Sequence, residues 1–348
     1  MTTVYLIRHA EAEGNLYRRC HGHYDATITP RGYRQIAELA KRFANVRIDA
    51  VYSSDLTRTM TTALAITRPR GIPLHTSRDF REVGVGAWED RTWAWLARFD
   101  LERLVRFNTA IATWQVEGGE RMAEVLDRML SGLRAVIAAH PGETVAVFSH
   151  GMALRTLLGT LQGLSLEEID RSAHAENTAV AKLEADGDSI RVVWRDDASH
   201  LPDELTTMKR QAWTKSKDGI EPGVWFVRDP AEGHFTVYYE DERVGAVAVS
   251  PIGDGAASVD ELCLNERLRG RNLGIRLVGQ AVSYARTLGC DTLRAVLPRS
   301  DDLALRRAEE YGFAAVSGTA ESVMLERRFG TDEAYRIKCF DEAMAENK

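Results

Sequence analysis

The chain has 348 residues, of which 44% are hydrophobic and 28% charged, and it carries a formal net charge of −6. This composition is ordinary for a globular protein, excludes a disordered chain and leaves room for two domains. The acidic balance argues against general binding to nucleic acid or to an anionic membrane. No targeting leader or membrane span is evident, and four scattered cysteines without a CxxC pair favour reduced thiols, so we expect a cytoplasmic protein.

The first 200 residues alternate strand-like and helix-like segments, which is typical of an α/β domain with helices packed on a sheet. Strands are predicted at residues 4–7, 50–53, 144–148, 179–183 and 190–194. Helices are predicted at residues 31–43, 54–67, 121–139 and 152–161, the first introduced by Thr29-Pro30 as a cap and a first-turn proline. Arginine and histidine residues gather near the ends of three of these strands.

Two histidines follow two strands in equivalent positions. Strand 4–7 ends in Arg8-His9, and strand 144–148 ends in Ser149-His150-Gly151. If the two strands are parallel neighbours, both imidazoles meet at the carboxyl edge of the sheet, where open α/β sheets bind ligands. An arginine fork matches phosphate oxygens and an imidazole can attack phosphorus, so the pattern indicates phosphoryl chemistry. An isolated Arg-His pair would more often be a plain surface feature.

Two further segments supply partners for these histidines. Arg58 falls in the first turn of the helix after strand 50–53, where a helix N-terminus and an arginine together form a natural anion pocket. Glu82 precedes a glycine-rich turn and an aromatic cluster, and it is the candidate proton donor.

Taken together, the four segments resemble the histidine phosphatase superfamily, which has the phosphoglycerate-mutase-like fold. The resemblance covers about residues 1–200 and implies an α/β domain of three layers. It rests on Arg8-His9-Ala10-Glu11 with Asn15, Ser53-Ser54-Asp55-Leu56-Thr57-Arg58, Arg81-Glu82 with Gly86, and Ser149-His150-Gly151.

The resemblance implies a mechanism that needs no metal or other cofactor. His9 would take the phosphoryl group as a phosphohistidine, and Glu82 would protonate the leaving alcohol. Arg8, Arg58 and a protonated His150 would complete the catalytic set by holding the phosphate oxygens. The substrate phosphate-binding residues that it implies are Arg8, Asn15, His21, Gly22, Arg58, His150 and Gly151.

The segment around Glu82 distinguishes two branches of the superfamily. It reads Arg-Glu-x-x-x-Gly-x-Trp-Glu, as in the phosphatases, and lacks the Glu-Arg-His-Tyr-Gly stretch typical of the true mutases, so we favour a phosphatase. His21 stands where a glutamine is usual. His21 and His23 can be read as a metal pair, but loop histidines beside an anion pocket are the more common case.

After a connecting segment at residues 201–222, a new pattern begins. A hairpin at 235–249, a strand at 258–264, a glycine-rich loop at 269–274, a helix to about 288 and a strand at 292–297 together resemble the GNAT acetyltransferase family over residues 223–330, with a tail at 331–348. The resemblance implies an α+β domain that binds acyl-CoA, with acetyl-CoA as the expected cofactor and an amine as acceptor. The cofactor-binding residues that it implies are Leu262, Cys263, Leu264, Arg269, Gly270, Arg271, Asn272, Leu273 and Gly274.

Three positions in this second half depart from the GNAT pattern. Asn272 stands at the central glycine of the loop, Asp301 stands where an asparagine usually meets the cofactor, and Ala308 replaces a tyrosine that commonly protonates the departing thiolate. Acetyl transfer, acyl-CoA sensing and a purely structural role therefore stay open for this domain.

The main hypothesis from the sequence is a phosphomonoesterase fused to a GNAT-like domain, which would act on a small phosphomonoester. One alternative is a mutase of the phosphoglycerate type. Another is a non-catalytic protein that binds a phospholigand or senses acyl-CoA. The sequence indicates no nucleic-acid or membrane partner, and it does not indicate an oligomeric state.

Overall fold

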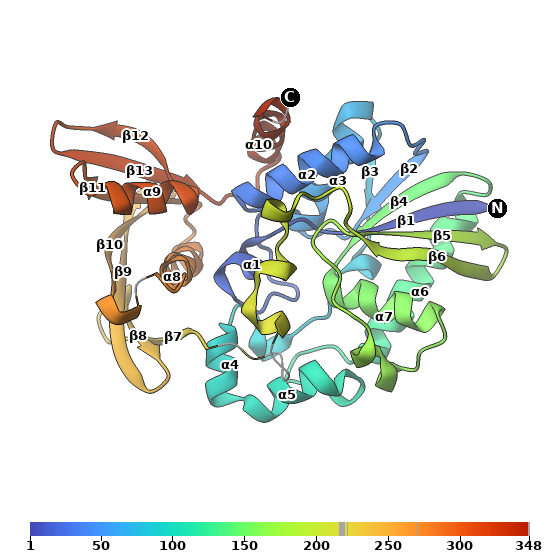
Figure 1. Ribbon diagram of the computed structural model, residues 1–348, viewed down its shortest axis with the longest axis horizontal. Helices are drawn as coiled ribbons and strands as arrows, with labels where there is room; N and C mark the ends of the chain where they lie inside the picture. Colours follow the sequence, from blue (N-terminus) through green and yellow to red (C-terminus); the bar gives the residue numbers. More distant parts are fainter. Residues whose placement is uncertain (216–219, 221, 269, 347–348) are drawn as a thin grey trace.

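The computed structural model describes residues 1–215, 220, 222–268 and 270–346, which form two separate sheets flanked by helices (Figure 1). The first sheet has the strand order β3-β2-β4-β1-β5-β6. Its strands are β1 (Thr2–Arg8), β2 (Ala50–Ser53), β3 (Leu74–Thr76), β4 (Thr144–Ser149), β5 (Val180–Asp186) and β6 (Ser189–Asp197). Strands β1 to β4 are parallel, whereas β5 and β6 are antiparallel additions at one edge.

Helices cover both faces of this first sheet (Figure 1). They are α1 (Glu13–Tyr17), α2 (Pro30–Phe43), α3 (Thr57–Arg70), α4 (Trp93–Phe99), α5 (Leu101–Thr109), α6 (Met122–Ala139) and α7 (Gly151–Leu161). Helices α6 and α7 pack on one face, and α2 and α3 pack on the other. No helix in the described part of the chain is both long and apolar enough to cross a bilayer.

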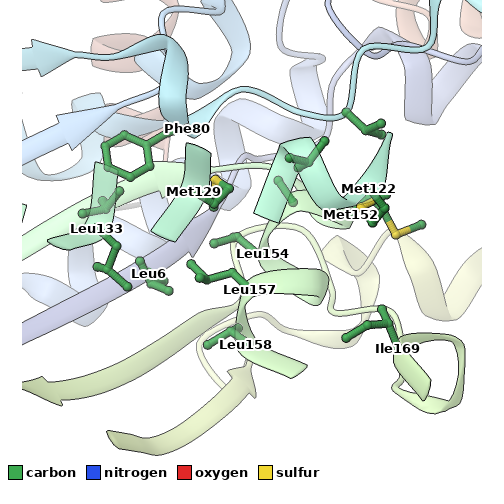
Figure 2. Packing of buried hydrophobic residues seen from close by; sticks show 14 of the residues in the cluster. Leu6, Phe80, Met122, Met129, Leu133, Met152, Leu154, Leu157, Leu158 and Ile169 are labelled. Atoms are coloured by element: carbon green, nitrogen blue, oxygen red, sulfur yellow. The ribbon is translucent and has the colours of Figure 1, made fainter. Parts of the chain in front are cut away.

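The strands at the centre of this sheet are buried on both faces. Val145 and Val147 of β4 belong to the core under α6 and α7, whereas Ala146 and Phe148 belong to the core under α2 and α3. Figure 2 shows the first of these cores, where Leu6 of β1 lies near side chains of α6 and α7. Burial on both faces explains why these strands read as continuous apolar runs in the sequence, as parallel strands usually do.

The second sheet has the strand order β12-β13-β11-β10-β9-β8-β7. Its strands are β7 (Val224–Arg228), β8 (His234–Tyr239), β9 (Glu242–Gly253), β10 (Ala256–Leu264), β11 (Thr292–Pro298), β12 (Ala314–Gly318) and β13 (Ser322–Arg328). Only β10 and β11 pair in parallel, and their register runs from Ala256 to Ser258 on β10. Beyond Ser258 the strand continues to Leu264 without β11 beside it, so the sheet opens between them.

Two helices complete the second domain, and a third returns to the first. Helices α8 (Gly274–Thr287) and α9 (Asp302–Glu310) accompany the second sheet, and α10 (Glu333–Glu346) lies in the segment predicted as a tail. Helix α10 packs on α2 and α3, where Phe340 and Ala343 are buried in the core of the first domain. The connecting segment contains the 3₁₀ turns η5 (Asp203–Leu205), η6 (Met208–Arg210) and η7 (Ala212–Lys215).

Helix α1 fastens the two domains together. The ring of Tyr17 is buried in the core of the second domain, against Gly279 of α8, where an added Cβ would come within 2.5 Å of the ring. Glu13 is fully buried, and its carboxylate pairs with Arg286 of α8 at 2.7 Å. Although burial alone would raise the pKa of Glu13, Arg286 and Arg327 hold it below its ordinary value. The interface therefore joins an apolar anchor to a buried ion pair.

The pattern in the sequence predicted the central elements, and most of their bounds agree within three residues. The N-cap of α2 is confirmed, because the Thr29 side chain accepts a hydrogen bond from the Gly32 backbone at 3.0 Å. Short elements were not predicted, among them α1, β3 and α4. Five to seven residues carry too few periodic positions to reveal a helix.

We expect Tyr17→Ala to lower the free energy of unfolding by about 3–5 kcal/mol, because it removes a fully packed aromatic ring. Calorimetric melting of the full chain measures the effect. Tyr17→Phe is the matched control: it keeps the ring and removes a buried hydroxyl for which the described residues offer no hydrogen-bond partner, so its melting temperature should not fall. Equal melting of Tyr17→Ala and wild type would contradict the anchoring role.

Candidate active site

The parallel pairing of β1 and β4 brings the two histidines together. Arg8 lies opposite Ser149 in the register, so His9 and His150 follow the two strands at the same edge of the sheet. Their ring centroids are 5.3 Å apart, and both rings are buried. The proximity expected from the sequence is thus observed.

The hydrogen bonding of His9 sets its tautomer. Its Nδ1 lies 2.7 Å from the carbonyl oxygen of Ala10, and because a carbonyl only accepts, Nδ1 carries the proton. The lone pair is then on Nε2. Burial, followed by the charges of Arg58 and Arg8, lowers the pKa of His9 well below its ordinary value near 6.5. His9 is therefore a neutral imidazole with a free nucleophilic nitrogen at neutral pH.

His150 differs from the protonated form that the sequence comparison implied. Its Nδ1 accepts a hydrogen bond from Arg58 Nε at 3.2 Å, and burial together with Arg58 and His9 lowers its pKa well below 6.5. His150 is thus neutral in this structure, with its proton on Nε2. That nitrogen is buried and has no partner among the described residues. An anion accepting from Nε2 would satisfy it and would raise its pKa.

Two buried arginines flank the histidines. Arg8 donates through Nη1 to the carbonyl of Ala175, while its Nε is buried without a partner in the described structure. A side chain at Gly151 would come within 3.2 Å of this guanidinium, which accounts for a glycine there. Arg58 donates to the carbonyls of Gly22 and Tyr24 at 2.7 and 2.9 Å. Arg58 therefore holds the 22–24 loop as well as His150.

Gly22 was expected to bind the substrate phosphate, but its backbone groups have other partners. Its N–H donates to Glu89 at 3.1 Å and its carbonyl accepts from Arg58, so neither group faces a substrate phosphate. An added Cβ would lie 2.4 Å from the Val83 carbonyl. The glycine is needed for close packing of two loops.

The N-terminus of α3 is likewise not a free anion pocket. The carboxylate of Asp25 accepts hydrogen bonds from the backbone N–H and the hydroxyl of Thr57 at 2.7 and 2.8 Å. Because this carboxylate already caps the helix, Arg58 would contact an anion through its side chain alone.

Glu82 lies at the N-terminus of α7. Its carboxylate accepts hydrogen bonds from the backbone N–H groups of Val83, Met152 and Ala153 at 2.9–3.0 Å. Its backbone carbonyl accepts from His23 at 2.9 Å and from Arg128 at 2.7 Å. These contacts fix Glu82 beside Gly151 at the edge that carries both histidines.

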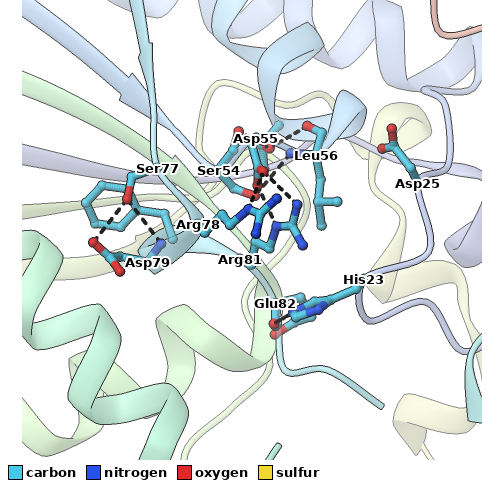
Figure 3. Close-up of polar contacts among 12 residues, drawn as sticks. His23, Asp25, Ser54, Asp55, Leu56, Ser77, Arg78, Asp79, Arg81 and Glu82 are labelled. Atoms are coloured by element: carbon cyan, nitrogen blue, oxygen red, sulfur yellow. Dashed lines mark hydrogen bonds and ion pairs between the residues drawn. The ribbon is translucent and has the colours of Figure 1, made fainter. Parts of the chain in front are cut away.

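The neighbouring residue Arg81 anchors the same segment. Figure 3 shows its guanidinium paired with both carboxylate oxygens of Asp55, each at 2.6 Å. Such a fork-to-fork pair is geometrically strict, so it fixes the segment that carries Glu82 relative to the start of α3.

His21 is held by an acid rather than aimed as a free ligand. Its Nε2 lies 2.9 Å from Asp90, which also pairs with Arg19 at 2.6 Å and accepts from Ser283 of α8 at 2.5 Å. Although burial alone would raise the pKa of Asp90, Arg19 and His21 hold it far below its ordinary value. Within the residues described, no group of three or more His, Cys, Asp and Glu side chains is arranged to hold a metal ion.

A pocket of about 150 Å³ opens over this edge. Of the residues expected from the sequence, it is lined by Arg8, His9, Asn15, His21, Arg58, Glu82 and Gly151. Apolar side chains form one wall of the pocket: Val83, Val85, Trp93, Phe107, Met152 and Met208. Cys20 also lines it, but burial raises the pKa of its thiol well above the ordinary value, so it is not a thiolate nucleophile.

Asn177 is a further residue that the sequence did not reveal. Its Nδ2 donates to the carbonyl of His9 at 2.8 Å and lies 3.5 Å from Asn15 Oδ1. It thereby fixes the backbone of the residue that carries the nucleophilic nitrogen. Asn177 lies just before β5, far from any motif, so only the folded structure identifies it.

The second candidate site lies at the start of α8. Leu262, Cys263, Leu264 and residues 270–274 line one cavity, whereas Arg269 is outside the described residues. Asn272 has φ of +58°, the left-handed conformation that the glycine of this loop would adopt easily and that asparagine tolerates best among other residues. The loop geometry therefore survives the substitution.

Asp301 and Ala308, the other two positions that depart from the GNAT pattern, do not line this cavity. Asp301 caps α9 by accepting from the Ala304 backbone at 3.0 Å, and Ala308 is buried in the core of the second domain. Tyr311, three residues further on, lines the cavity, and an added Cβ on Gly274 would lie 3.2 Å from its hydroxyl.

Comparison with known proteins agrees with this geometry. The profile of the histidine phosphatase superfamily (branch 1) matches residues 4–198, more than half of the sequence, and the chain belongs to that superfamily. The profile of the acetyltransferase (GNAT) family matches residues 195–313, which include most of the second sheet.

Among curated proteins, the chain is 31% identical to the probable phosphoglycerate mutase GpmB of Cronobacter sakazakii over 184 residues, which are 53% of this chain and 85% of GpmB. It is 35% identical to GpmB of Yersinia pestis over 176 residues, 51% of this chain and 79% of that protein. Both similarities concern the first domain.

Among solved structures, YhfR of Bacillus stearothermophilus matches with a TM-score of 0.56 and 31% identity, over 57% of this chain and 99% of YhfR. The α-ribazole phosphatase of Shigella flexneri matches with a TM-score of 0.51 and 22% identity, over 56% of this chain and 96% of its own, which supports the fold alone.

The buried neutral histidines make stability depend on pH. Between the lowered pKa of His9 and about 6.5, the unfolded chain binds more protons than the native one, so the free energy of unfolding falls as the pH drops below about 6.5. We expect His9→Gln to flatten this slope by up to about 1.4 kcal/mol per pH unit. Denaturant unfolding between pH 7 and 5 measures it. His75→Gln, at an exposed histidine, should keep the slope of wild type, and an unchanged slope in His9→Gln would contradict the assignment.

Proposed function

We propose that the first domain is a metal-independent phosphomonoesterase that works through a phosphohistidine on His9. The observation that carries the proposal is the tautomer of His9, which presents an unprotonated Nε2 between two buried arginines and a second imidazole. This arrangement joins a nucleophile to donors that match the equatorial oxygens of a phosphoryl group.

In the first step, Nε2 of His9 attacks phosphorus as the bond from phosphorus to the ester oxygen breaks. Arg8 Nε and His150 Nε2 are buried donors to which the described residues offer no acceptor, and they would bind the developing negative charge. Glu82, in its protonated form, would transfer its proton to the departing alkoxide, so that the product leaves as a neutral alcohol.

In the second step, water attacks the phosphohistidine. Glu82, now a carboxylate, would take a proton from that water as the P–N bond breaks, and inorganic phosphate leaves with His9 restored. The three backbone N–H groups around Glu82 hold its side chain at the pocket edge.

The pocket wall favours an ester with an apolar body. Val83, Val85 and Met152 line the same pocket as His9, beside Trp93 and Phe107. An apolar leaving group would bury surface there, whereas the carboxylate of a phosphoglycerate would not. The alternative is a phosphoglycerate mutase, because the GpmB relatives are named as probable phosphoglycerate mutases. Transfer of phosphate between positions of one substrate, faster than its hydrolysis, would establish the alternative.

We expect His9→Ala to lower kcat/KM for phosphomonoesters by at least about a thousandfold, because it removes the nitrogen that forms the proposed phosphohistidine. A panel of aryl, sugar and nucleotide monoesters, assayed for phosphate release in EDTA, measures it. Brief reaction of wild type with labelled substrate should also trap an acid-labile, alkali-stable phosphoenzyme.

His75→Ala, at an exposed histidine outside the pocket, is the matched control and should behave as wild type. If wild type releases no phosphate from any ester, the first domain is instead a phospholigand-binding module. If His9→Ala retains full activity, His9 is not the nucleophile and the phosphohistidine mechanism is wrong.

We further propose that the second domain binds acyl-CoA. The supporting observation is the opening between β10 and β11 beyond Ser258, next to the 270–274 loop and its two left-handed residues, Gly270 and Asn272. The pantetheine arm would pair with Leu262–Leu264, and the loop N–H groups would bind the pyrophosphate. Calorimetry with acetyl-CoA tests binding, and a product assay with amine acceptors distinguishes acetyl transfer from sensing.

A further inference from the structure

A cavity of about 1100 Å³ lies between the two domains. The second domain contributes the Leu262–Leu264 strand end, the 270–274 loop and one side of α9. The opposite wall comes from the first domain, through α1 and the first turns of α2, and from the connecting segment near Arg210. The proposed acyl-CoA site is thus closed on one side by the phosphatase domain.

Positive charge dominates this cavity. Among the described residues its lining includes seven arginines: Arg18, Arg31, Arg34, Arg210, Arg271, Arg276 and Arg307. The two acidic residues of the lining are already paired, Glu11 with Arg31 at 3.1 Å and Glu310 with Arg307 at 2.6 Å. The whole chain has a net charge of −6, so this local excess of arginines over acidic residues favours binding of a ligand with several negative charges.

The first-domain wall is built rigidly. Glu11 is buried, and its carboxylate accepts hydrogen bonds from Thr29 at 2.7 Å, Arg31 at 3.1 Å and Thr207 at 3.0 Å. The bond to Thr207 ties the connecting segment, which carries Arg210 three residues later, to the start of α2. Arg34 lies one turn after Arg31 on that helix, so the two share a face.

We propose that Arg31, Arg34 and Arg210 bind the ribose 3′-phosphate of CoA across the domain boundary. The inference rests on the proposed acyl-CoA binding. In the acyl-CoA proposal, pantetheine lies along the Leu262–Leu264 strand end and the pyrophosphate lies at the 270–274 loop. The adenosine part of CoA would then occupy the rest of the cavity. Arg31 and Arg34 of the first domain and Arg210 of the connecting segment line the cavity, and guanidinium forks match the oxygens of a phosphate monoester.

This site is distinct from the phosphatase pocket. The two cavities share only Asn15, Arg18 and Gln211 among the residues that the structure describes. Neither His9 nor Glu82 lines the interdomain cavity, and Arg34 and Arg210 do not line the phosphatase pocket, so these two arginines can be changed without touching the proposed catalytic groups.

The test compares CoA with dephospho-CoA, which lacks the 3′-phosphate, by calorimetry on the full chain. Wild type should bind CoA about tenfold more tightly, and the preference should shrink in high salt. The exposed pair is changed in R34Q/R210Q, which should lose about tenfold in CoA affinity and leave dephospho-CoA unchanged. Arg31 is kept, because its loss would leave the buried Glu11 without its ion pair.

Two control variants complete the test. R271Q, in the loop of the second domain, should lower the affinities for CoA and dephospho-CoA equally, because Arg271 would contact the pyrophosphate that both ligands contain. R47Q removes an exposed arginine that does not line the cavity, and it should leave both affinities unchanged. Phosphate release by R34Q/R210Q should equal that of wild type, which shows that the variant is folded.

Equal binding of CoA and dephospho-CoA by wild type, or an unchanged preference in R34Q/R210Q, would overturn the inference while leaving the acyl-CoA proposal intact. Failure of wild type to bind either compound would overturn both. The phosphatase proposal is judged separately, by phosphate release and by His9→Ala.

Discussion

The in-register parallel pairing of β1 with β4 is the constraint on which the candidate active site depends. It places His9 beside His150 at one sheet edge, next to two buried arginines. In that setting a protonated imidazole would add a third desolvated positive charge, so both rings stay neutral. One ring then offers a lone pair and the other an N–H donor. A phosphate dianion bound beside His150 would favour its protonated form, so the proposed mechanism couples protonation of His150 to binding of the phosphate.

Helix α1 and the loop after it serve both domains at once. Tyr17 and Glu13 are buried against α8, while His21 lines the pocket of the candidate active site. Asp90 links the two regions, because it contacts His21 on one side and Ser283 of α8 on the other. Separating the domains would expose an apolar ring and leave Glu13 without its cations, at a cost of several kcal/mol. These contacts therefore fix the two domains relative to each other, and they also hold residues of the candidate active site in place.

The sequence predicted those parts of the site that lie at strand ends. Arg8, His9 and His150 follow directly from the sheet topology, because side chains after parallel strands share an edge. Other features depend on contacts between distant loops. The N–H of Gly22 is taken by Glu89, and the tautomer of His150 is set by Arg58; neither contact has a signal in local patterning. The wall of the interdomain cavity could not be predicted from the sequence either, because its arginines come from segments more than two hundred residues apart.

The two cavities handle negative charge in opposite ways. In the candidate active-site pocket Arg8 and Arg58 are buried, and desolvation would strengthen their contacts with a phosphoryl group, as the proposed transfer requires. In the interdomain cavity Arg34, Arg210 and Arg271 are exposed, so each contact is screened and modest. Many weak contacts suit a large ligand whose charges are spread over several phosphates and that must also be released. The contrast is consistent with the proposed phosphoryl transfer in the first cavity and with the proposed binding of the nucleotide end of acyl-CoA in the second.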